Sequence, residues 1–99
     1  MLLESRYQRE LIDKIKVQYP GAVILKNDPS YIQGIPDLIV LYGLNWAALE
    51  AKRSSKARVG PNQIHYVRKL NAMSYASFVY PENEMEVLNE IQRTLQPGR

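Results

Sequence analysis

The chain has 99 residues, of which 45% are hydrophobic and 23% charged, and its formal net charge at pH 7 is +3. This length and balance predict one globular domain with a modest core. With no cysteine and a single histidine, the sequence excludes a disulfide scaffold, a cysteine nucleophile and a thiolate or histidine-rich metal site. A metal site would have to be built from oxygens, which favours hard ions such as Mg²⁺ or Mn²⁺.

No segment of the sequence predicts contact with a membrane. The N-terminus lacks a basic segment followed by an apolar run, so no signal peptide is expected. No apolar stretch approaches the roughly 20 residues that a membrane helix needs. We therefore expect a soluble protein that works in the cytoplasm and has no membrane partner.

The basic residues form a block in the second half of the chain. From Ala51 to Pro81 the sequence contains no acidic residue. The positively charged residues of this stretch, with one histidine among them, are Lys52, Arg53, Lys56, Arg58, His65, Arg68 and Lys69. A one-sided basic block suits a polyanionic partner such as nucleic acid. The alternative is a solvated loop followed by a solvated helix face.

The first expected element is an amphipathic helix over Leu2–Tyr19. Its apolar residues recur at helical spacing and are Leu3, Tyr7, Leu11, Ile12 and Ile15. Pro20-Gly21 ends the helix. A short strand is expected over Ala22–Lys26, and the turn-forming run Asn27-Asp28-Pro29 interrupts it.

Two further strands are expected to form a hairpin. Residues 37–42 read as a buried strand, and residues 46–52 read as a second one. Gly43-Leu44-Asn45 between them is a turn, so the two strands should pair. A polar, basic loop over residues 53–60 follows.

The C-terminal part predicts a helix, a strand and a helix. Pro61 opens a helix that runs to about Met73, because proline is tolerated in a first helical turn. A strand is expected over Tyr75–Tyr80 and a last helix over Glu82–Leu95. The apolar stripe of that helix is expected at Met85, Leu88, Ile91 and Leu95. The order αβββαβα predicts an α/β fold with a small mixed sheet flanked by helices.

Glu50 and Lys52 are the first candidates for chemistry. A strand alternates its faces with a period of two, so both side chains should point the same way. Their strand otherwise carries Trp, Ala and Leu, where unpaired buried charges are costly. One interpretation is an edge strand with a solvated face. The other is a functional face on which a carboxylate and an ammonium act together.

Asp37 is expected to lie opposite Glu50. In a two-residue type II′ turn with Gly43 first, Tyr42 faces Asn45. Counting back along both strands pairs Asp37 with Glu50, with their Cβ atoms roughly 5 Å apart. Two facing carboxylates repel each other, and a divalent cation that bridges them would compensate. A turn longer by one residue would place them on opposite faces. An Asp beside Pro is also a common turn residue.

The helical angles of the first helix separate its two glutamates. With Leu11 at angle zero and about 100° per residue, Glu4 and Gln8 fall within roughly 60° of it, on the apolar side. Glu10 falls about 100° away on the other side and should face solvent. A glutamate on a buried face needs a partner or a metal. Alternatively, Glu4 pairs with the dipole of the helix N-terminus.

These motifs resemble a known group of enzymes. The run Gly34-Ile35-Pro36-Asp37, with Glu50-Ala51-Lys52 thirteen residues after Asp37, resembles the signature of the PD-(D/E)XK nuclease superfamily. The finer similarity is to the stand-alone, often viral, VRR-NUC proteins and to the related archaeal Holliday-junction resolvases. It covers nearly the whole chain, including Gln63 in the helix after the motif. The resemblance implies a restriction-endonuclease-like core and one nuclease domain over residues 1–99.

The resemblance also implies a reaction, the hydrolysis of DNA phosphodiester bonds with Mg²⁺ or Mn²⁺. Asp37 and Glu50 would bind the metal together with the backbone carbonyl of Ala51. Lys52 would orient or activate the attacking water. A divalent ion polarises the phosphoryl oxygen and lowers the pKa of bound water, and a lysine beside the phosphorus stabilises developing charge. No histidine or serine nucleophile is required.

Two more residues enter the site on the same grounds. In the family a glutamate of the first helix completes the acidic site, often with a glutamine one turn later, and Glu4 with Gln8 fits that spacing. Gln63, in the first turn of the helix that begins at Pro61, would lie near the phosphate or a water on the metal. The alternative for Gln63 is an exposed polar residue at a helix start.

Four residues are expected to contact DNA outside the reacting centre. They are Arg53, Lys56 and Arg58 on the basic loop and Gln33 on the loop before Pro36, because phosphate contacts supply sequence-independent affinity. Tyr31 could also reach DNA, although loop aromatics usually pack. Packing is the favoured role of His65 and Trp46, and a turn beside Pro29 is the favoured role of Asp28.

A Holliday junction needs two symmetric cuts, so a twofold homodimer is the simple expectation. A junction resolvase leads among the enzyme hypotheses, followed by a nicking or flap-type nuclease. Two other classes stay open. One is a DNA-binding module with an inactive site, and the other is a nonenzymatic interaction protein whose hairpin charges form a solvated edge.

Overall fold

The computed structural model describes residues 3–98 and contains a four-stranded sheet and three helices. The elements are α1 (Glu4–Gln18), β1 (Val23–Lys26), β2 (Leu38–Tyr42), β3 (Asn45–Ala51), α2 (Pro61–Met73), β4 (Tyr75–Val79) and α3 (Glu84–Leu95). The expected fold class is confirmed, an α/β fold with a small mixed sheet flanked by helices in the order αβββαβα. Leu2, the expected start of the first helix, lies outside the described residues.

The sheet has the strand order β1-β2-β3-β4. The first three strands pair antiparallel, and β4 pairs parallel to β3, because α2 carries the chain back across the sheet. Gly43 has a φ of +60° and Leu44 has no positive φ, which is the pattern of a two-residue type II′ turn. Tyr42 therefore pairs with Asn45, so the predicted register of the hairpin is confirmed.

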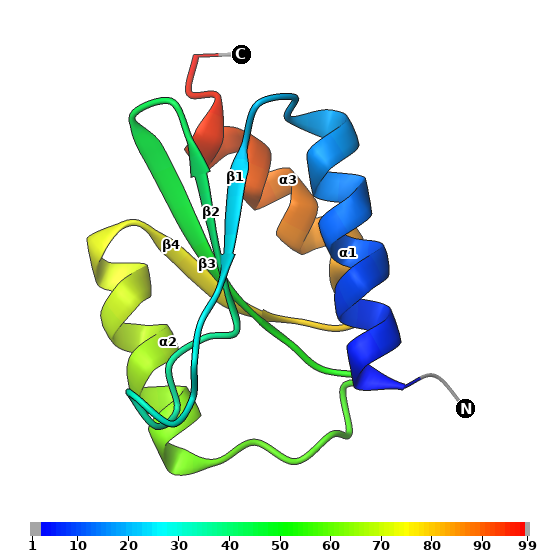
Figure 1. The fold of residues 1–99 in the computed structure, drawn as a ribbon, viewed down its shortest axis with the longest axis vertical. Coiled ribbons are helices and arrows are strands. Elements are labelled where there is room, and N and C mark those ends of the chain that lie inside the picture. Colours follow the sequence, from blue (N-terminus) through cyan, green and yellow to red (C-terminus); the bar gives the residue numbers. More distant parts are fainter. Residues whose placement is uncertain (1–2, 99) are drawn as a thin grey trace.

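Helices cover both faces of the sheet (Figure 1). Against one face, α1 and α3 bury the larger core. Its fully enclosed members include Leu11 and Ile15 of α1, Leu38 of β2, Leu49 of β3 and Ile91 of α3. Against the other face, Val67 of α2 packs on Ala48 and Ala76. Successive residues of β3 point alternately to the two faces of the sheet, and Ala48 points to the α2 face. Glu50 and Lys52, two and four residues later, therefore point to the α2 face as well.

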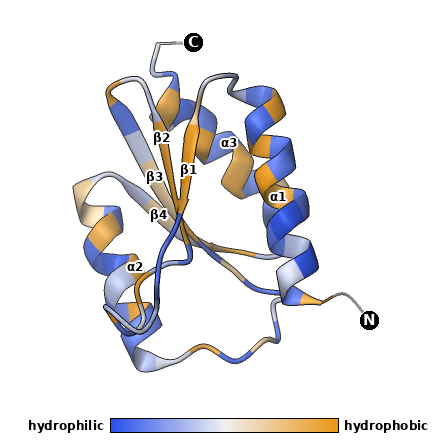
Figure 2. Cartoon of the chain, in the orientation of Figure 1, coloured by the Kyte–Doolittle hydropathy of each residue, from blue (hydrophilic) through white to orange (hydrophobic). Residues whose placement is uncertain are grey.

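Each helix carries both hydrophilic and hydrophobic residues (Figure 2), and apolar residues of α1 and α3 join the larger core. On α3 the buried stripe is Val87, Ile91 and Leu95, whereas Met85 is 79% exposed. The expectation for Met85 was wrong, because it lies two residues, about 200° of helical rotation, from Val87. Leu3 is also exposed, since it precedes the first turn of α1. Within residues 3–98, no helix combines the length and the apolar character needed to cross a bilayer.

Candidate active site

Three carboxylates from separate segments meet at one end of the sheet. Asp37 immediately precedes β2, Glu50 is the sixth residue of β3, and Glu4 is the first residue of α1. One carboxylate oxygen from each lies within 4.8 Å of the others. The ladder pairs Leu38 with Leu49, so the next position brings Asp37 opposite Glu50. Glu4 reaches the same point because the N-terminal end of α1 lies at that end of the sheet (Figure 1).

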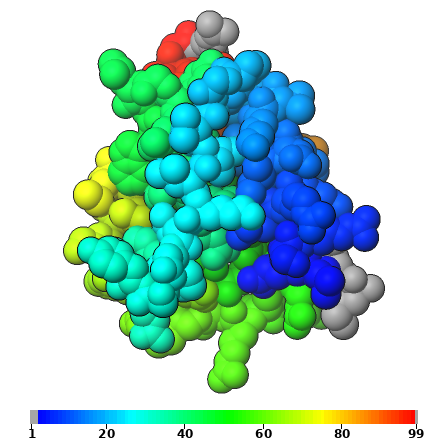
Figure 3. Space-filling view, viewed as in Figure 1, coloured from blue at the N-terminus to red at the C-terminus, as the bar shows by residue number. Residues whose placement is uncertain are grey.

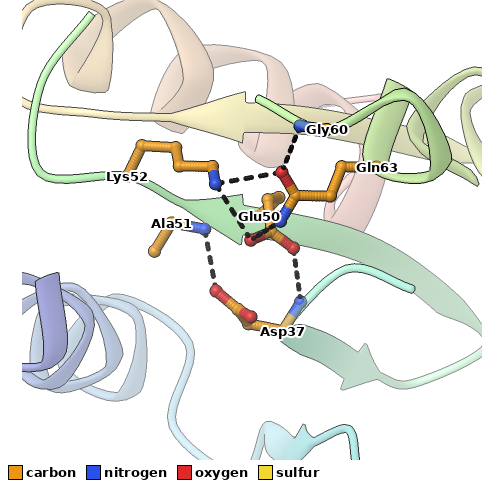
Figure 4. Close-up of polar contacts among 6 residues, drawn as sticks. All are labelled: Asp37, Glu50, Ala51, Lys52, Gly60 and Gln63. Carbon is orange, nitrogen blue, oxygen red and sulfur yellow. Dashed lines mark hydrogen bonds and ion pairs between the residues drawn. The ribbon is translucent and has the colours of Figure 1, made fainter. Parts of the chain in front are cut away.

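The carboxylates of Asp37 and Glu50 each accept a hydrogen bond from a backbone N–H of the opposite strand segment (Figure 4). The Asp37 N–H donates to Glu50 Oε1 at 3.2 Å, and the Ala51 N–H donates to Asp37 Oδ2 at 3.3 Å. The N–H and C=O of one strand residue point to the same edge, so the Ala51 carbonyl faces Asp37 as well. The two side chains and this carbonyl thus form a small set of oxygens where the β2–β3 ladder ends.

Lys52 and Gln63 close the other side of Glu50. Lys52 Nζ donates to Gln63 Oε1 at 3.0 Å and lies 4.0 Å from Glu50 Oε2. Gln63 Nε2 donates to the same Glu50 oxygen at 3.2 Å. Gln63 Oε1 also accepts from the Gly60 N–H at 3.1 Å, which holds the amide to the start of α2. Lys52 is fixed at its backbone, since its N–H donates to the Val79 carbonyl at 2.8 Å.

In the described part of the chain, the three carboxylates of the site outnumber the one ammonium beside them, that of Lys52. Burial, and then the negative charge of Asp37, raise the pKa of Glu50 to about 8, although the Lys52 ammonium opposes this shift. Burial also raises the pKa of Asp37, while the hydrogen bond from Ala51 lowers it and the charge of Glu4 raises it. Glu50 is only 3% exposed, so water screens its charge poorly. A cation beside these acids would relieve the repulsion.

A hard divalent cation fits this set of donors. The available ligands are all oxygens, the type that Mg²⁺ and Mn²⁺ prefer. Oxygens on opposite sides of a Mg²⁺ ion lie about 4.2 Å apart. The oxygens of Glu4, Asp37 and Glu50 already lie within 4.8 Å, so small side-chain movements would bring all three to one ion. The Ala51 carbonyl would be a fourth ligand from the same end of the sheet.

Of the four residues expected to contact DNA, two line one groove and two lie outside it. Arg58 and Gln33 line a groove of about 560 Å³ that Lys52 and Gln63 also line. Arg53 and Lys56 are exposed on the same loop as Arg58 but outside the lining of that groove. The loop is held by Glu82, whose carboxylate accepts from the Ser55 N–H and hydroxyl.

Several other expectations concern residues around the site. Asp28 Oδ1 accepts from the N–H and the hydroxyl of Ser30, which confirms its turn role. Trp46 packs on the smaller core as expected. His65 is exposed and makes an edge contact with the ring of Tyr66, so it packs against a neighbouring side chain on the surface of α2 and not in the core. Tyr31 is 86% exposed on its loop.

Two features of the site were not predicted from the sequence. One is the contact of Gly34 with α2, where a Cβ on Gly34 would lie 2.5 Å from Asn62 Cβ. The other is the bond from the Gly60 N–H to Gln63. The first joins a loop to a helix whose relative position only the folded chain defines, whereas the second is a local bond between the N-cap of α2 and its third residue. The glycine in the motif and the helix-start position of Gln63 were the nearest hints.

Comparisons with known proteins give one structural similarity. No family model matches the chain, and no curated protein matches it. Among solved structures, it is similar to Archaeoglobus fulgidus Hjc, a Holliday junction resolvase from an archaeal hyperthermophile. Sequence identity is 14%, the match covers 74% of this chain and 67% of the resolvase, and the TM-score is 0.47. At these values the similarity decides nothing about activity, so the function has to be judged from the site itself.

Proposed function

We propose that this protein is a divalent-metal-dependent endonuclease that hydrolyses DNA phosphodiester bonds, with residues 1–99 as one nuclease domain. The observation that carries the proposal is the meeting of Glu4, Asp37 and Glu50 within 4.8 Å. On the other side of Glu50, Lys52 is only 7% exposed and is bonded to Gln63. A solvated edge strand, the rival interpretation, gives no reason to bury a carboxylate and an ammonium together.

Each residue of the site has a role in this reaction. Glu4, Asp37, Glu50 and the Ala51 carbonyl would hold the cation, Mg²⁺ or Mn²⁺. When bound, that ion polarises the phosphoryl oxygen and lowers the pKa of water. Lys52 places a positive charge beside Glu50, where it would stabilise the negative charge that develops on the phosphate oxygens. Gln63 fixes the Lys52 ammonium, so its orientation is set before the substrate arrives.

DNA is the proposed substrate because the surroundings of the acids are basic. Lys52, Arg53, Lys56 and Arg58 follow one another within seven residues, and the last three are exposed. Exposed cations near an acidic metal site provide affinity for phosphates. Within this activity we place branched DNA such as a Holliday junction first, following the resemblance of the motifs to the VRR-NUC proteins. Nicking and flap cleavage come next.

We further propose that the protein acts as a twofold dimer. Residues 3–98 of one chain offer one such set of acids, and a junction is resolved by two symmetric cuts. A dimer needs apolar surface, and Val23, Leu25 and Leu41 expose apolar side chains on the sheet. Val23 and Leu41 are direct neighbours in the ladder. Sedimentation of the purified chain at micromolar concentration would give twice the 11.4 kDa chain mass if this is correct.

The test of activity compares three DNA shapes in parallel. A four-way junction, a linear duplex and a flap are incubated with the protein in Mn²⁺, in Mg²⁺ and in EDTA. We expect cleavage with either ion and none in EDTA, with the junction cut fastest. Lys52→Ala should lower the cleavage rate by about 10²-fold or more, the cost of removing one preorganised charge-stabilising group.

Calorimetric titration with Mn²⁺ separates the rival classes. Asp37→Asn should abolish metal binding, whereas Lys52→Ala should retain it, because Lys52 is not a ligand. Metal binding without cleavage of any DNA would identify an inactive DNA-binding module. Neither metal binding nor cleavage, with Asp37→Asn as stable as the natural chain, would leave the nonenzymatic interpretation.

A further inference from the structure

A groove of about 560 Å³ lies next to the candidate active site. Its walls come from the loop before β2, the basic loop after Lys52 and the first turn of α2. The lining residues are Pro29, Gln33, Gly34, Lys52, Arg58, Gly60, Pro61, Asn62 and Gln63. In the space-filling view, the cyan-to-teal residues before β2 and the green residues before α2 occupy the lower end of the molecule, beside the blue N-terminal turn of α1 (Figure 3).

The charge of the groove is opposite to that of the neighbouring acids. Its lining contains Lys52 and Arg58 and no acidic residue. The first turn of α2, at Pro61 to Gln63, adds the positive end of the helix dipole. An arginine guanidinium binds phosphate through paired N–H groups. The chemistry of the groove therefore suits a phosphate, with amide groups of Gln33 and Asn62 available for a sugar.

The shape of the groove is fixed by one close contact. Gly34 has a φ of +90°, and a Cβ built there would lie 2.5 Å from Asn62 Cβ and 2.6 Å from the Asn62 carbonyl carbon. The loop before β2 therefore touches the backbone of α2 at a point where only glycine fits. Two of the three walls are held against each other in this way, so the groove does not depend on a ligand to form.

Lys52 marks the boundary between the groove and the acids. Its ammonium contacts Gln63 and lies 4.0 Å from Glu50, and its side chain also lines the groove. A DNA strand that presents one phosphate to the acids would pass Lys52 and present a neighbouring phosphate to Arg58. The groove is larger than a phosphate group needs, so the attached sugar fits as well.

We propose that this groove binds the phosphodiester next to the one that is cut, with Arg58 as its main contact. The inference rests on the proposed nuclease function, since it defines the site relative to the cut. It assigns Arg58 a role that Arg53 and Lys56, outside the groove lining, do not share. The contact positions the strand, so it acts on substrate binding and not on the bond-breaking step.

The first experiment measures binding without cleavage. The affinity of Arg58→Gln for a fluorescent four-way junction is measured in EDTA over a range of salt concentrations. We expect about a tenfold weaker affinity and a salt slope smaller by about one, the loss of one phosphate contact. Arg9→Gln is the matched control, because Arg9 is exposed on α1 and has no role in the site. Its affinity should stay within twofold of the natural chain.

The second experiment locates the phosphate relative to the cut. Single neutral methylphosphonates replace the phosphates on either side of the mapped cleavage position, one at a time. One neighbouring position should raise KM about tenfold for the natural chain at unchanged kcat. The same substitution should have no further effect on Arg58→Gln, because the partner charge is already gone.

The outcomes separate this inference from the nuclease proposal. Cleavage by Arg58→Gln with unchanged KM and unchanged salt slope overturns the groove and leaves the nuclease standing. Effects of methylphosphonates that persist in Arg58→Gln also overturn it. If the natural chain cuts no DNA but Arg58→Gln loses affinity, the nuclease proposal fails and the groove is supported as a backbone-binding site.

Discussion

Gln63 donates a hydrogen bond from Nε2 to Glu50 Oε2 at 3.2 Å, and its Oε1 accepts from Lys52 Nζ at 3.0 Å. One neutral amide therefore connects the buried acid with the buried ammonium, which lie 4.0 Å apart. The amide is itself held by the Gly60 N–H. The start of α2 thus sets the position of two charged groups on β3 and just beyond its end.

Removing this amide should impair catalysis more than metal binding. In Gln63→Ala, Lys52 loses its hydrogen bond and only Glu50 orients its ammonium. We expect kcat to fall 10- to 100-fold, the usual effect of removing a supporting hydrogen bond, while the Kd for Mn²⁺ rises less, because only one of the three carboxylates loses a partner. The start of α2 should also lose about 1 kcal/mol of stability with its cap, so rates are compared well below the unfolding temperature.

Gln92→Ala on the exposed face of α3 is the control for this variant. It removes the same amide from a helix without touching the site. A Gln63→Ala protein with kcat within twofold of the natural chain would refute the positioning role of Gln63.

The raised pKa of Glu50 predicts an unusual pH dependence of stability. Burial and Asp37 raise the pKa of Glu50 to about 8, so the folded chain without metal binds a proton that the unfolded chain has released. The free energy of unfolding in EDTA should therefore fall as pH rises from about 4.5 towards 8, by on the order of a few kcal/mol. Urea denaturation at intervals of half a pH unit measures this slope.

Mn²⁺ should reverse the trend, because a cation binds the charged carboxylates and its affinity rises with pH in the same range. Glu50→Gln removes the titrating group with little change of shape, so its stability in EDTA should lose this slope and its response to Mn²⁺ should weaken. A natural chain whose stability in EDTA rises across this pH range would contradict the assignment to Glu50.

The sequence predicted the relative positions of the three carboxylates where local geometry determines them. The two-residue turn at Gly43 fixed the pairing of Tyr42 with Asn45, and simple counting then brought Asp37 opposite Glu50. Helical angles placed Glu4 on the inner side of α1, and the structure places it with the other two acids. These inferences succeed because strand and helix periods are fixed by the backbone.

Prediction from the sequence failed for features that depend on how one helix or loop packs on another. The sequence of α3 offers two apolar stripes, and only packing selects Val87 over Met85. The groove beside Lys52 depends on the contact of Gly34 with Asn62, which joins a loop to a helix more than 25 residues later. Such contacts depend on the whole fold, so neither the periodicity of helices and strands nor the type of a turn predicts them.

Comparing Gly34 with Gly21 measures the contact of Gly34 with Asn62, because the two glycines have nearly the same φ. Gly34 has a φ of +90° and Gly21 a φ of +89°, but a Cβ on Gly21 would meet no atom within 4 Å. Gly21→Ala should cost about 1 kcal/mol, the strain of a left-handed residue. Gly34→Ala should cost that amount and about 1–3 kcal/mol more, because the new Cβ overlaps the backbone of α2. Urea denaturation of both variants gives the difference. Equal losses in the two variants would show that the loop moves freely away from the helix.

The last prediction concerns how α1 holds Glu4 at the site. Tyr7 lies one turn after Glu4, and its hydroxyl donates to Glu84 Oε1 of α3 at 2.8 Å, while Lys14 Nζ donates to Oε2 at 2.6 Å. Tyr7→Phe keeps the buried ring and removes only the hydroxyl bond, so the free energy of unfolding should fall by about 1 kcal/mol.

The looser docking of α1 in this variant should also weaken Mn²⁺ binding by a few-fold, because Glu4 is the ligand that α1 would supply. Tyr31→Phe, on a ring that is 86% exposed, is the matched control and should change neither the stability nor the Kd for Mn²⁺. Denaturation and metal titration on the same samples test both effects. A Tyr7→Phe protein that is destabilised but binds Mn²⁺ as tightly as the natural chain would contradict this prediction. The bond from Tyr7 to Glu84 would then stabilise the fold without positioning Glu4.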